Sequence, residues 1–194
     1  MVKLNRDKIR RVIASVDWGY TNPGVILGWA IDNDDRMYMI HETYRTRHLI
    51  EWWVEEASRL QKLYDIEVFV CDPAEPAYIE QFQRAGLFSI PAINDIAPGI
   101  QAVQQRLRVV SDGLPRIFFY RDANEAPDMA LDSQRKPLGT IQEFPGYIWP
   151  KTVDDKTVKE VPVKVNDHAM DAVRYAVMYM DAPTKVEYGP SIWG

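Results

Sequence analysis

Short runs of apolar, β-prone residues separated by polar turns fill the first quarter of the chain. The pattern predicts strands over 12–17, 25–31 and 36–44. Turn formers, including Gly, Asn, Asp and Pro, occupy 19–24 and 32–35 between these runs. Because the connections are short, the three strands are expected to form an antiparallel meander.

Apolar residues at helical spacing alternate with further β-prone runs in the middle of the chain. Strands are predicted over 67–72, 89–93 and 117–120. Amphipathic helices are predicted over 48–64, 75–86 and 99–110. A meander followed by alternating strands and helices predicts an α/β fold, with a central mixed sheet flanked by helices.

The last third of the chain is predicted to hold a hairpin and a final helix. Segments 141–150 and 157–165 flank the polar turn Asp154-Asp155-Lys156, and the first of them carries Glu143, Tyr147 and Trp149 at alternating positions. Residues 122–140 have no clear period beyond one helix with a loop. The last helix is predicted over 166–181, with Asn166 as its N-cap, Asp167 in its first turn and an apolar stripe of Ala169, Val173, Ala176, Val177 and Met180.

These elements are expected to form one domain. Residues 1–11 form a basic lead-in or linker, 12–182 the folded domain and 183–194 a turn-rich tail. No apolar run reaches the roughly 18 residues of a spanning helix, and the start lacks the apolar stretch of a secretory signal. The chain is therefore expected in the cytosol, without a membrane partner.

Charge and cysteine content narrow the chemistry. The formal net charge is −5, which argues against binding nucleic acid by bulk positive charge. Cys71 is the only cysteine, which excludes an internal disulfide framework and a thiolate metal cluster. A metal site would use carboxylates and histidine.

Two aspartates each end an apolar, β-prone run. Asp17 follows 12–16 and Asp72 follows 67–71. Ligand sites gather at the carboxyl ends of strands, so on neighbouring strands the two carboxylates would face each other. Paired carboxylates are costly without a cation, and their hard oxygen atoms select Mg²⁺ or Mn²⁺. The alternative for either residue alone is a turn former or helix cap. Trp18 is expected on the opposite face, in the core.

A third acidic group lies on the last helix. Helical spacing places Asp167 and Asp171 one turn apart, with His168 three residues before Asp171. Asp167 has a structural explanation in the helix dipole, whereas Asp171 lies a turn deeper. His168 can bind metal, orient a water or meet a phosphate, and the alternative is an ordinary surface or core histidine.

Three segments together resemble a known family. They are 16–24 (VDWGYTNPG), 71–73 (CDP) and 166–176 (NDHAMDAVRYA), and 143–149 (EFPGYIW) resembles the strand that precedes a hairpin in that family. The chain resembles the nuclease domain of the terminase large subunit of tailed bacteriophages. The resemblance implies a ribonuclease-H-like fold with an extra β-hairpin before the C-terminal helix.

The resemblance also implies the site. Its acidic cluster becomes Asp17, Asp72 and Asp171, with His168 close by and Asp167 as a further candidate ligand. Such a site implies two-metal phosphodiester cleavage with Mg²⁺ or Mn²⁺, in which Asp17 bridges the ions. The implied activity is an endonuclease with little sequence preference.

The implied setting is viral genome packaging. The endonuclease would cut concatemeric double-stranded viral DNA in the host cytoplasm. Members of the family carry an N-terminal ATPase motor, yet no G-x-x-x-x-G-K-[ST] phosphate loop occurs here, so the chain resembles an isolated nuclease domain. The implied partners are that motor, the small terminase subunit and the portal.

Loop cations are the candidate DNA contacts. Phosphate contacts by lysine and arginine supply affinity without reading sequence. For each such residue taken singly, solvated surface charge is the favoured explanation. The candidates are Arg135, Lys136, Lys151, Lys156, Lys159 and Lys164.

Three other functions compete with this interpretation of the sequence. A Holliday-junction resolvase or transposase core would share the carboxylates but needs a dimer surface or further DNA-binding domains. A sugar kinase or actin-like module needs a second half and glycine-rich phosphate loops, for which the chain is too short. A non-catalytic DNA-binding platform would keep the fold without any metal requirement.

Overall fold

The first three strands form the predicted meander at the centre of the sheet. The computed structural model describes residues 6–147 and 165–182, beginning with a 3-10 turn at Arg6–Lys8. Strand β1 (Ile9–Asp17) pairs antiparallel with β2 (Gly24–Asp32), and β2 pairs antiparallel with β3 (Met37–Arg45). Strand β1 begins three residues before the predicted run, so 9–11 belong to the sheet.

Three shorter strands extend the meander into a mixed six-stranded sheet. Strand β4 (Ile66–Cys71) pairs parallel with β1, and β5 (Ser89–Pro91) pairs parallel with β4. Strand β6 (Ile117–Phe119) pairs parallel with β3 at the other edge. The strand order is β5-β4-β1-β2-β3-β6, which confirms the predicted mixed sheet.

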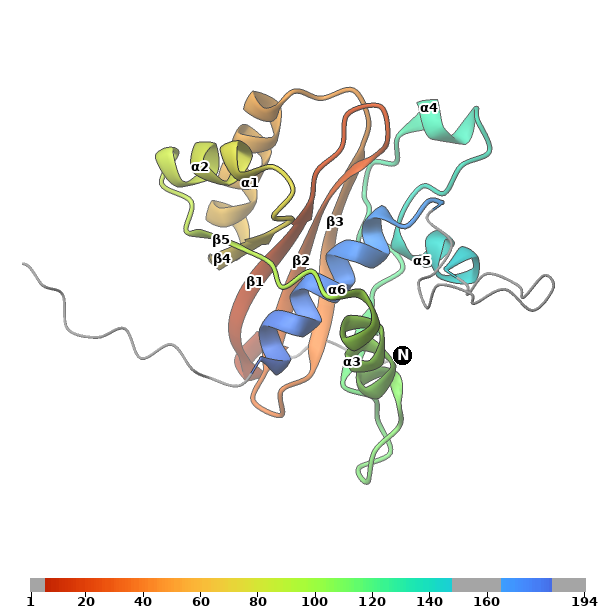
Figure 1. Ribbon diagram of the computed structural model, residues 1–194. Coiled ribbons are helices and arrows are strands. Elements are labelled where there is room, and N and C mark those ends of the chain that lie inside the picture. Colours follow the sequence, from red (N-terminus) through yellow and green to blue (C-terminus); the bar gives the residue numbers. More distant parts are fainter. Residues whose placement is uncertain (1–5, 148–164, 183–194) are drawn as a thin grey trace, which may run out of the picture.

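Helices cover both faces of this sheet (Figure 1). Helix α1 (Ile50–Tyr64) and α2 (Pro76–Arg84) pack on one face, where Trp53, Phe69 and Phe82 are buried. Helix α3 (Ile96–Leu107) and α6 (His168–Asp181) pack on the other. The second core contains Trp29 and the apolar stripe of α6. Burying apolar surface on both faces is the main stabilising contribution to such a layered fold.

The segment before α6 differs from the sequence prediction. A strand was expected over 141–150, but 140–146 fold into the short helix α5 (Thr140–Glu143) and a 3-10 turn, Phe144–Gly146. The buried acid Glu42 accepts hydrogen bonds from the backbone N and Oγ1 of Thr140, which holds the start of α5 against the sheet. The rest of the predicted hairpin lies outside the described residues. Before α5, the helix expected within 122–140 is α4 (Met129–Asp132).

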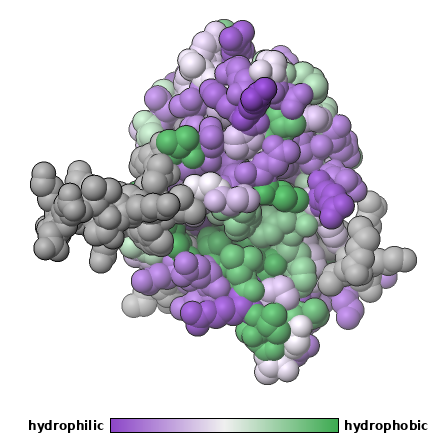
Figure 2. Space-filling model, turned by 90° about the vertical axis from the view of Figure 1, so that its right-hand side faces the viewer, coloured by the Kyte–Doolittle hydropathy of each residue, from purple (hydrophilic) through white to green (hydrophobic). Residues whose placement is uncertain are grey.

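One face of the molecule exposes hydrophobic side chains. Figure 2 shows them in the middle and at the lower end of the side that carries α3, α4 and α5. Among the described residues, the exposed hydrophobic side chains include Ile141 on α5 and Val109 and Val110 after α3. Within the described part of the chain, no helix combines the length and apolar character needed to cross a bilayer.

Candidate active site

Four strand ends and the start of one helix meet at one end of the sheet. Strand β1 ends at Asp17 and the parallel strand β4 ends at Cys71, with Val16 paired to Cys71. Strand β2 begins and β3 ends at the same edge, because Gly24 pairs with Arg45. The N-terminus of α6 reaches this edge as well, since His168 contacts Asp17. The topology therefore brings the three predicted acidic segments together.

Asp17 is the most buried of the three predicted acids. Its exposed fraction is 6%, and its Oδ2 lies 3.1 Å from His168 Nδ1. Burial raises the pKa of Asp17 to about 7; the negative charges of Asp171 and Asp72 add to the rise, and His168 opposes it. The metal-free site therefore holds a carboxyl group that ionises near neutral pH.

Asp72 lies one residue beyond β4, as the sequence predicted. Its Oδ1 accepts a hydrogen bond from the backbone N of Ala74 at 3.0 Å, and its carbonyl oxygen accepts one from Trp18 Nε1 at 2.9 Å. Burial raises the pKa of Asp72, and the charge of Asp171 adds to the rise. Trp18 packs against Phe82 on the face covered by α1 and α2, which confirms that it points away from the Asp17 side.

Asp171 is held by an arginine on its own helix. Arg174 is 1% exposed and donates to Asp171 Oδ1 from Nη2 at 2.8 Å and from Nε at 3.2 Å. Its guanidinium also donates to the Asp95 carbonyl and Asn94 Oδ1, both at 3.3 Å. Gly99 makes room for it, because a Cβ there would lie 3.2 Å from Arg174 Cδ. The buried cation fixes one oxygen of Asp171.

Tyr175 lies within electrostatic reach of the three acids. It is 1% exposed, four residues after Asp171 on α6. Burial raises the pKa of its hydroxyl, and the charges of Asp17, Asp171 and Asp72 raise it further. All three carboxylates thus lie within electrostatic reach of one buried phenol, which stays a neutral hydrogen-bond donor.

His168 and Asp167 occupy the start of α6. Burial by itself lowers the pKa of His168, but the hydrogen bond and negative charge of Asp17 outweigh it, so the pKa is raised. The negative charge of Asp167 acts in the same direction. The sequence placed Asn166 at the N-cap, which is wrong: Asp167 occupies it without a side-chain cap, and Asn166 has φ 51°.

Glu143, which lies outside α6, caps the N-terminus of this helix. Its Oε2 accepts hydrogen bonds from the backbone N of Ala169 at 2.8 Å and of Met170 at 3.1 Å, and its Oε1 accepts one from Tyr44 Oη at 2.6 Å. The first backbone N–H groups of a helix lack partners inside the helix, and an anion there also suits the helix dipole. Burial nonetheless raises the pKa of Glu143 to about 7. This acid positions the helix that carries His168 and Asp171.

The carboxylate oxygens of Asp17, Asp72 and Asp171 are ligands that suit a hard divalent cation. These side chains are not, however, arranged as a complete coordination shell. In 6–147 and 165–182, no three or more His, Cys, Asp or Glu side chains are arranged to hold a metal ion. The reason is visible in the contacts, since Asp17 is engaged by His168 and Asp171 by Arg174. The mutual repulsion of the three acids is the feature that a cation would relieve.

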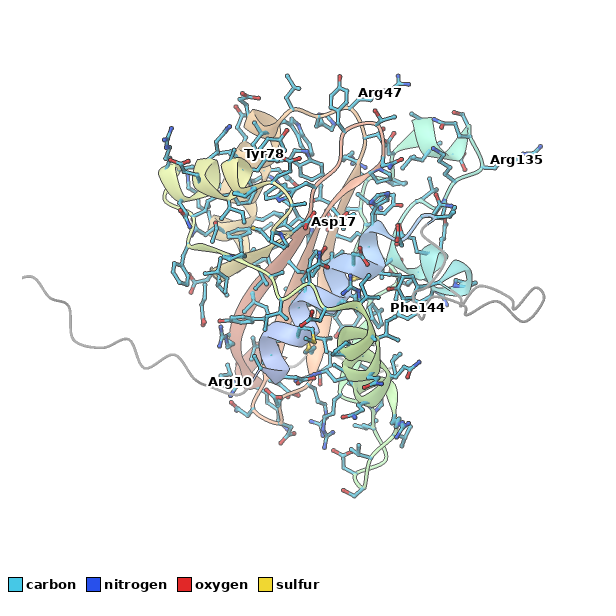
Figure 3. All side chains as sticks on the ribbon, viewed as in Figure 1. Arg10, Asp17, Arg47, Tyr78, Arg135 and Phe144 are labelled. Carbon is cyan, nitrogen blue, oxygen red and sulfur yellow. The ribbon has the colours of Figure 1, made fainter. Side chains whose placement is uncertain are left out.

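The predicted DNA-contact residues are only partly described. Arg135 is exposed beyond α4 and projects away from Asp17 (Figure 3). Lys136 is half-buried beside it, and neither forms an ion pair within the described residues. Lys151, Lys156, Lys159 and Lys164 lie outside the described residues. A cation that the sequence analysis missed, Arg47, lies two residues beyond β3, which ends at the same end of the sheet as Asp17.

Four site residues were missed by sequence reasoning. Helical spacing from Asp171 could have found Arg174 at i+3 and Tyr175 at i+4. Arg47 could have been found by counting strand directions, because β3 runs to the same edge as β1. Glu143 carried no local signal, since its partners lie 26 and 27 residues further along the chain.

Solved large terminases share this fold. No protein-family model and no curated protein sequence matches the chain. The large terminase of a thermophilic bacteriophage superposes with a TM-score of 0.69 at 22% identity, over 92% of this chain and 42% of that one. The chain thus spans about two fifths of the length of that thermophilic phage protein.

Isolated nuclease domains match over most of both chains. The large-terminase nuclease domain of bacteriophage SPP1, solved with bound Mn, gives a TM-score of 0.61 at 16% identity, over 89% of this chain and 88% of that one. The P22 large-terminase nuclease domain gives 0.55 at 16% identity, over 92% and 84%. These matches confirm the ribonuclease-H-like fold predicted from the sequence.

Proposed function

We propose that this chain, which has the fold of the large-terminase nuclease domains, is a divalent-metal-dependent DNA endonuclease that cuts concatemeric viral DNA during genome packaging in the host cytoplasm. The observation that carries the proposal is the burial of Asp17 within reach of the charges of Asp72 and Asp171. Three acids gathered at the carboxyl edge of a sheet are costly to the fold and are explained by a function that needs them. The Mn bound to the SPP1 domain supports a divalent ion.

Asp17, Asp72 and Asp171 would hold Mg²⁺ or Mn²⁺, with two ions as the expected number and Asp17 as the shared ligand. Ions at such a site stabilise the attacking and leaving oxygens of a phosphodiester hydrolysis. Oxygen from water forms a bond to phosphorus while the bond to one sugar oxygen breaks, which leaves a phosphate on one DNA end and a hydroxyl on the other. Asp167, which precedes His168, is a further candidate ligand for the metal.

The protein's own groups prepare this site. His168 orients Asp17 through its Nδ1 contact, and Arg174 fixes one oxygen of Asp171 while leaving the other available. Tyr175 offers a neutral hydroxyl within electrostatic reach of the three acids. His168 can also hold a proton, since its pKa is raised next to Asp17.

Weak binding of DNA by this domain alone is part of the proposal. The chain has a net charge of −5, and the basic candidates Arg135, Lys136, Lys151, Lys156, Lys159 and Lys164 supply phosphate contacts without base reading. Cutting with little sequence preference follows. The thermophilic phage terminase is more than twice as long as its matched part. We propose that an ATPase motor in the same protein, the small subunit and the portal hold the DNA and determine when it is cut.

Plasmid cleavage tests the proposal. Supercoiled DNA is incubated with the protein in Mg²⁺, Mn²⁺ or EDTA, and nicked and linear products are quantified. We expect cleavage only with metal, and a loss of at least a hundredfold in Asp17→Asn, Asp72→Asn and Asp171→Asn. Asp65→Asn is the matched control. Asp65 is exposed and precedes the start of β4, at the end of this strand opposite to Asp72, and its left-handed backbone (φ 55°) suits asparagine.

The outcomes separate the candidate functions. Uncut plasmid with every metal, from protein whose circular dichroism shows a folded α/β domain, would favour the DNA-binding platform. Preferential cutting of four-way junctions would favour the resolvase. Equal activity of Asp17→Asn and Asp65→Asn would contradict the assigned site.

A further inference from the structure

A pocket lined by aromatic rings opens beside the candidate catalytic edge. Its volume is about 340 Å³, at the small end of ligand-binding cavities. It shares Asp72 with the proposed metal site, and Trp18 in its wall directly follows Asp17. Five aromatic side chains line it: Trp18, Tyr20, His48, Trp53 and Tyr78.

The walls of this aromatic pocket are held in place. Trp18 Nε1 donates to the Asp72 carbonyl oxygen at 2.9 Å, and its ring packs edge-on against Tyr78 at a centroid distance of 5.4 Å. Trp53 is 3% exposed and lies so close to Gly24 that a Cβ there would be 2.6 Å from Trp53 Cζ2. A preformed aromatic wall favours a flat ligand, because little ordering is needed when it binds.

The rim of the pocket is exposed and apolar. Tyr20 is 55% exposed and Leu49 is 65% exposed, although both line the pocket. The backbone N of Arg47 donates to the Tyr20 carbonyl at 2.7 Å, so the exposed residue Arg47 adjoins this rim. Arg47 forms no ion pair within the part of the chain that the structure describes. Figure 3 shows Arg47 and Tyr78 in the upper part of the view, with Asp17 below them near the centre of the molecule.

Charge selects the chemical class of the ligand. Asp72 and Glu75 lie in the pocket wall, so a phosphate group would be repelled from its interior. A neutral, planar group would stack on the rings instead, while a phosphate attached to it would meet Arg47 outside. A nucleotide has this division between a neutral base and an anionic backbone.

We infer that the aromatic pocket receives one unpaired nucleobase of the DNA strand that is cut, with the adjoining backbone phosphate facing Arg47. The inference rests on the proposed nuclease function and names a subsite for its substrate. A paired base is not available for such stacking, so the pocket favours cleavage where the strand is single, frayed or flipped out.

The test uses a probe with a single base. A fluorescent 12-nucleotide backbone of abasic sites carrying one central adenine is compared with the same backbone without any base, by anisotropy in EDTA. We expect about tenfold tighter binding of the probe with the base, as for one base stacked on an aromatic side chain. Tyr20→Ala and Tyr78→Ala should abolish the difference, whereas Tyr78→Phe, which keeps the ring, should retain it.

Two controls isolate the base from the phosphate. Phe88→Ala removes an exposed aromatic side chain outside the pocket and should change nothing. Arg47→Gln should weaken both probes by the same factor, because a phosphate contact does not sense the base. Equal binding of the two probes by the unaltered protein would overturn the inference, and so would an undiminished difference in Tyr20→Ala, whose exposed side chain is dispensable for folding.

The nuclease proposal and this inference fail separately. Metal-dependent plasmid cleavage, together with equal binding of the two probes, would support the nuclease proposal and contradict the assignment of the pocket as a nucleobase site. A base-dependent difference in a protein that never cleaves DNA would keep the pocket as a nucleobase site and remove the nuclease.

Discussion

His168 Nδ1 lies 3.1 Å from Asp17 Oδ2, although the two residues are 151 positions apart in the chain. The contact joins the end of the central strand to the start of the last helix. It gives a buried carboxylate a defined orientation and ties the pKa of each group to the other. Both the stability and the proposed activity of the protein should therefore depend on this junction.

Replacing His168 should lower cleavage without unfolding the protein. His168→Ala removes the side-chain hydrogen bond of Asp17, and loss of a residue that orients a metal ligand commonly costs about 10- to 100-fold in activity or metal affinity. The measurement is the initial nicking rate across a Mg²⁺ titration, with His168→Gln as a variant that keeps a polar contact. An unchanged titration curve in His168→Ala would contradict the orienting role.

Divalent metal should stabilise the protein through Asp17. Because burial raises the pKa of Asp17 to about 7, its ionised form destabilises the metal-free fold above that pH by a free energy on the order of 4 kcal/mol. Asp17→Asn should therefore raise the melting temperature in EDTA, more at pH 8 than at pH 5. Mg²⁺ or Mn²⁺ should raise it for the unaltered protein alone. Equal metal shifts in both proteins would place the metal elsewhere.

Glu143 should make stability depend on pH. Its pKa rises from 4.5 to about 7 on folding, because the folded protein favours the protonated carboxyl group. The contribution of Glu143 to the free energy of unfolding is therefore complete below about pH 4.5 and is lost as the pH rises towards 7. Glu143→Gln has no such titration, so its stability relative to the unaltered protein should improve by roughly 3 kcal/mol between pH 4.5 and 7. Urea unfolding at several pH values measures this. A constant difference across the range would show that Glu143 titrates normally.

Arg174 should be needed for stability as well as for the site. Arg174→Met leaves Asp171 without its buried partner, and breaking a buried pair from one side typically costs about 3 to 5 kcal/mol. Arg174→Lys keeps the charge but lacks the planar donor set that also reaches Asn94 and Asp95, so it should recover only part of the loss. Chemical denaturation of both variants provides the test, and a loss under about 1 kcal/mol in Arg174→Met would contradict it.

The turn after Asp17 should require glycine. A Cβ at Gly19 would lie 2.3 Å from the Pro23 carbonyl oxygen and 2.6 Å from that of Asn22, both of which are backbone atoms. Gly19→Ala is expected to cost about 2 kcal/mol or more, since the backbone must shift. Gly146→Ala is the control, because no atom lies within 4 Å of its Cβ position. Similar melting temperatures for the two variants would show that the turn adapts.

Local patterns in the sequence were enough to locate most of the elements and the acidic positions. Alternation and helical spacing located the three meander strands, the strand before Asp72 and the helix that carries Asp171. These signals are local, because a strand or helix with one buried face repeats its apolar residues at a fixed period. The same locality explains why both strand-end aspartates were found. Their gathering at one edge follows from β1 and β4 being parallel neighbours.

The support of the site depends instead on contacts between distant parts of the chain. Alternation over 141–150 predicted a strand, yet Glu42, about a hundred residues earlier, holds Thr140 at the start of a helix. Asn166 had the local chemistry of a cap, yet Glu143 supplies the cap across the fold. Burial and pairing over such distances are fixed by the packing of the sheet and its helices. For that reason the raised pKa of Asp17, the clamp of Arg174 on Asp171 and the aromatic pocket beside Asp72 have no signature in the local sequence.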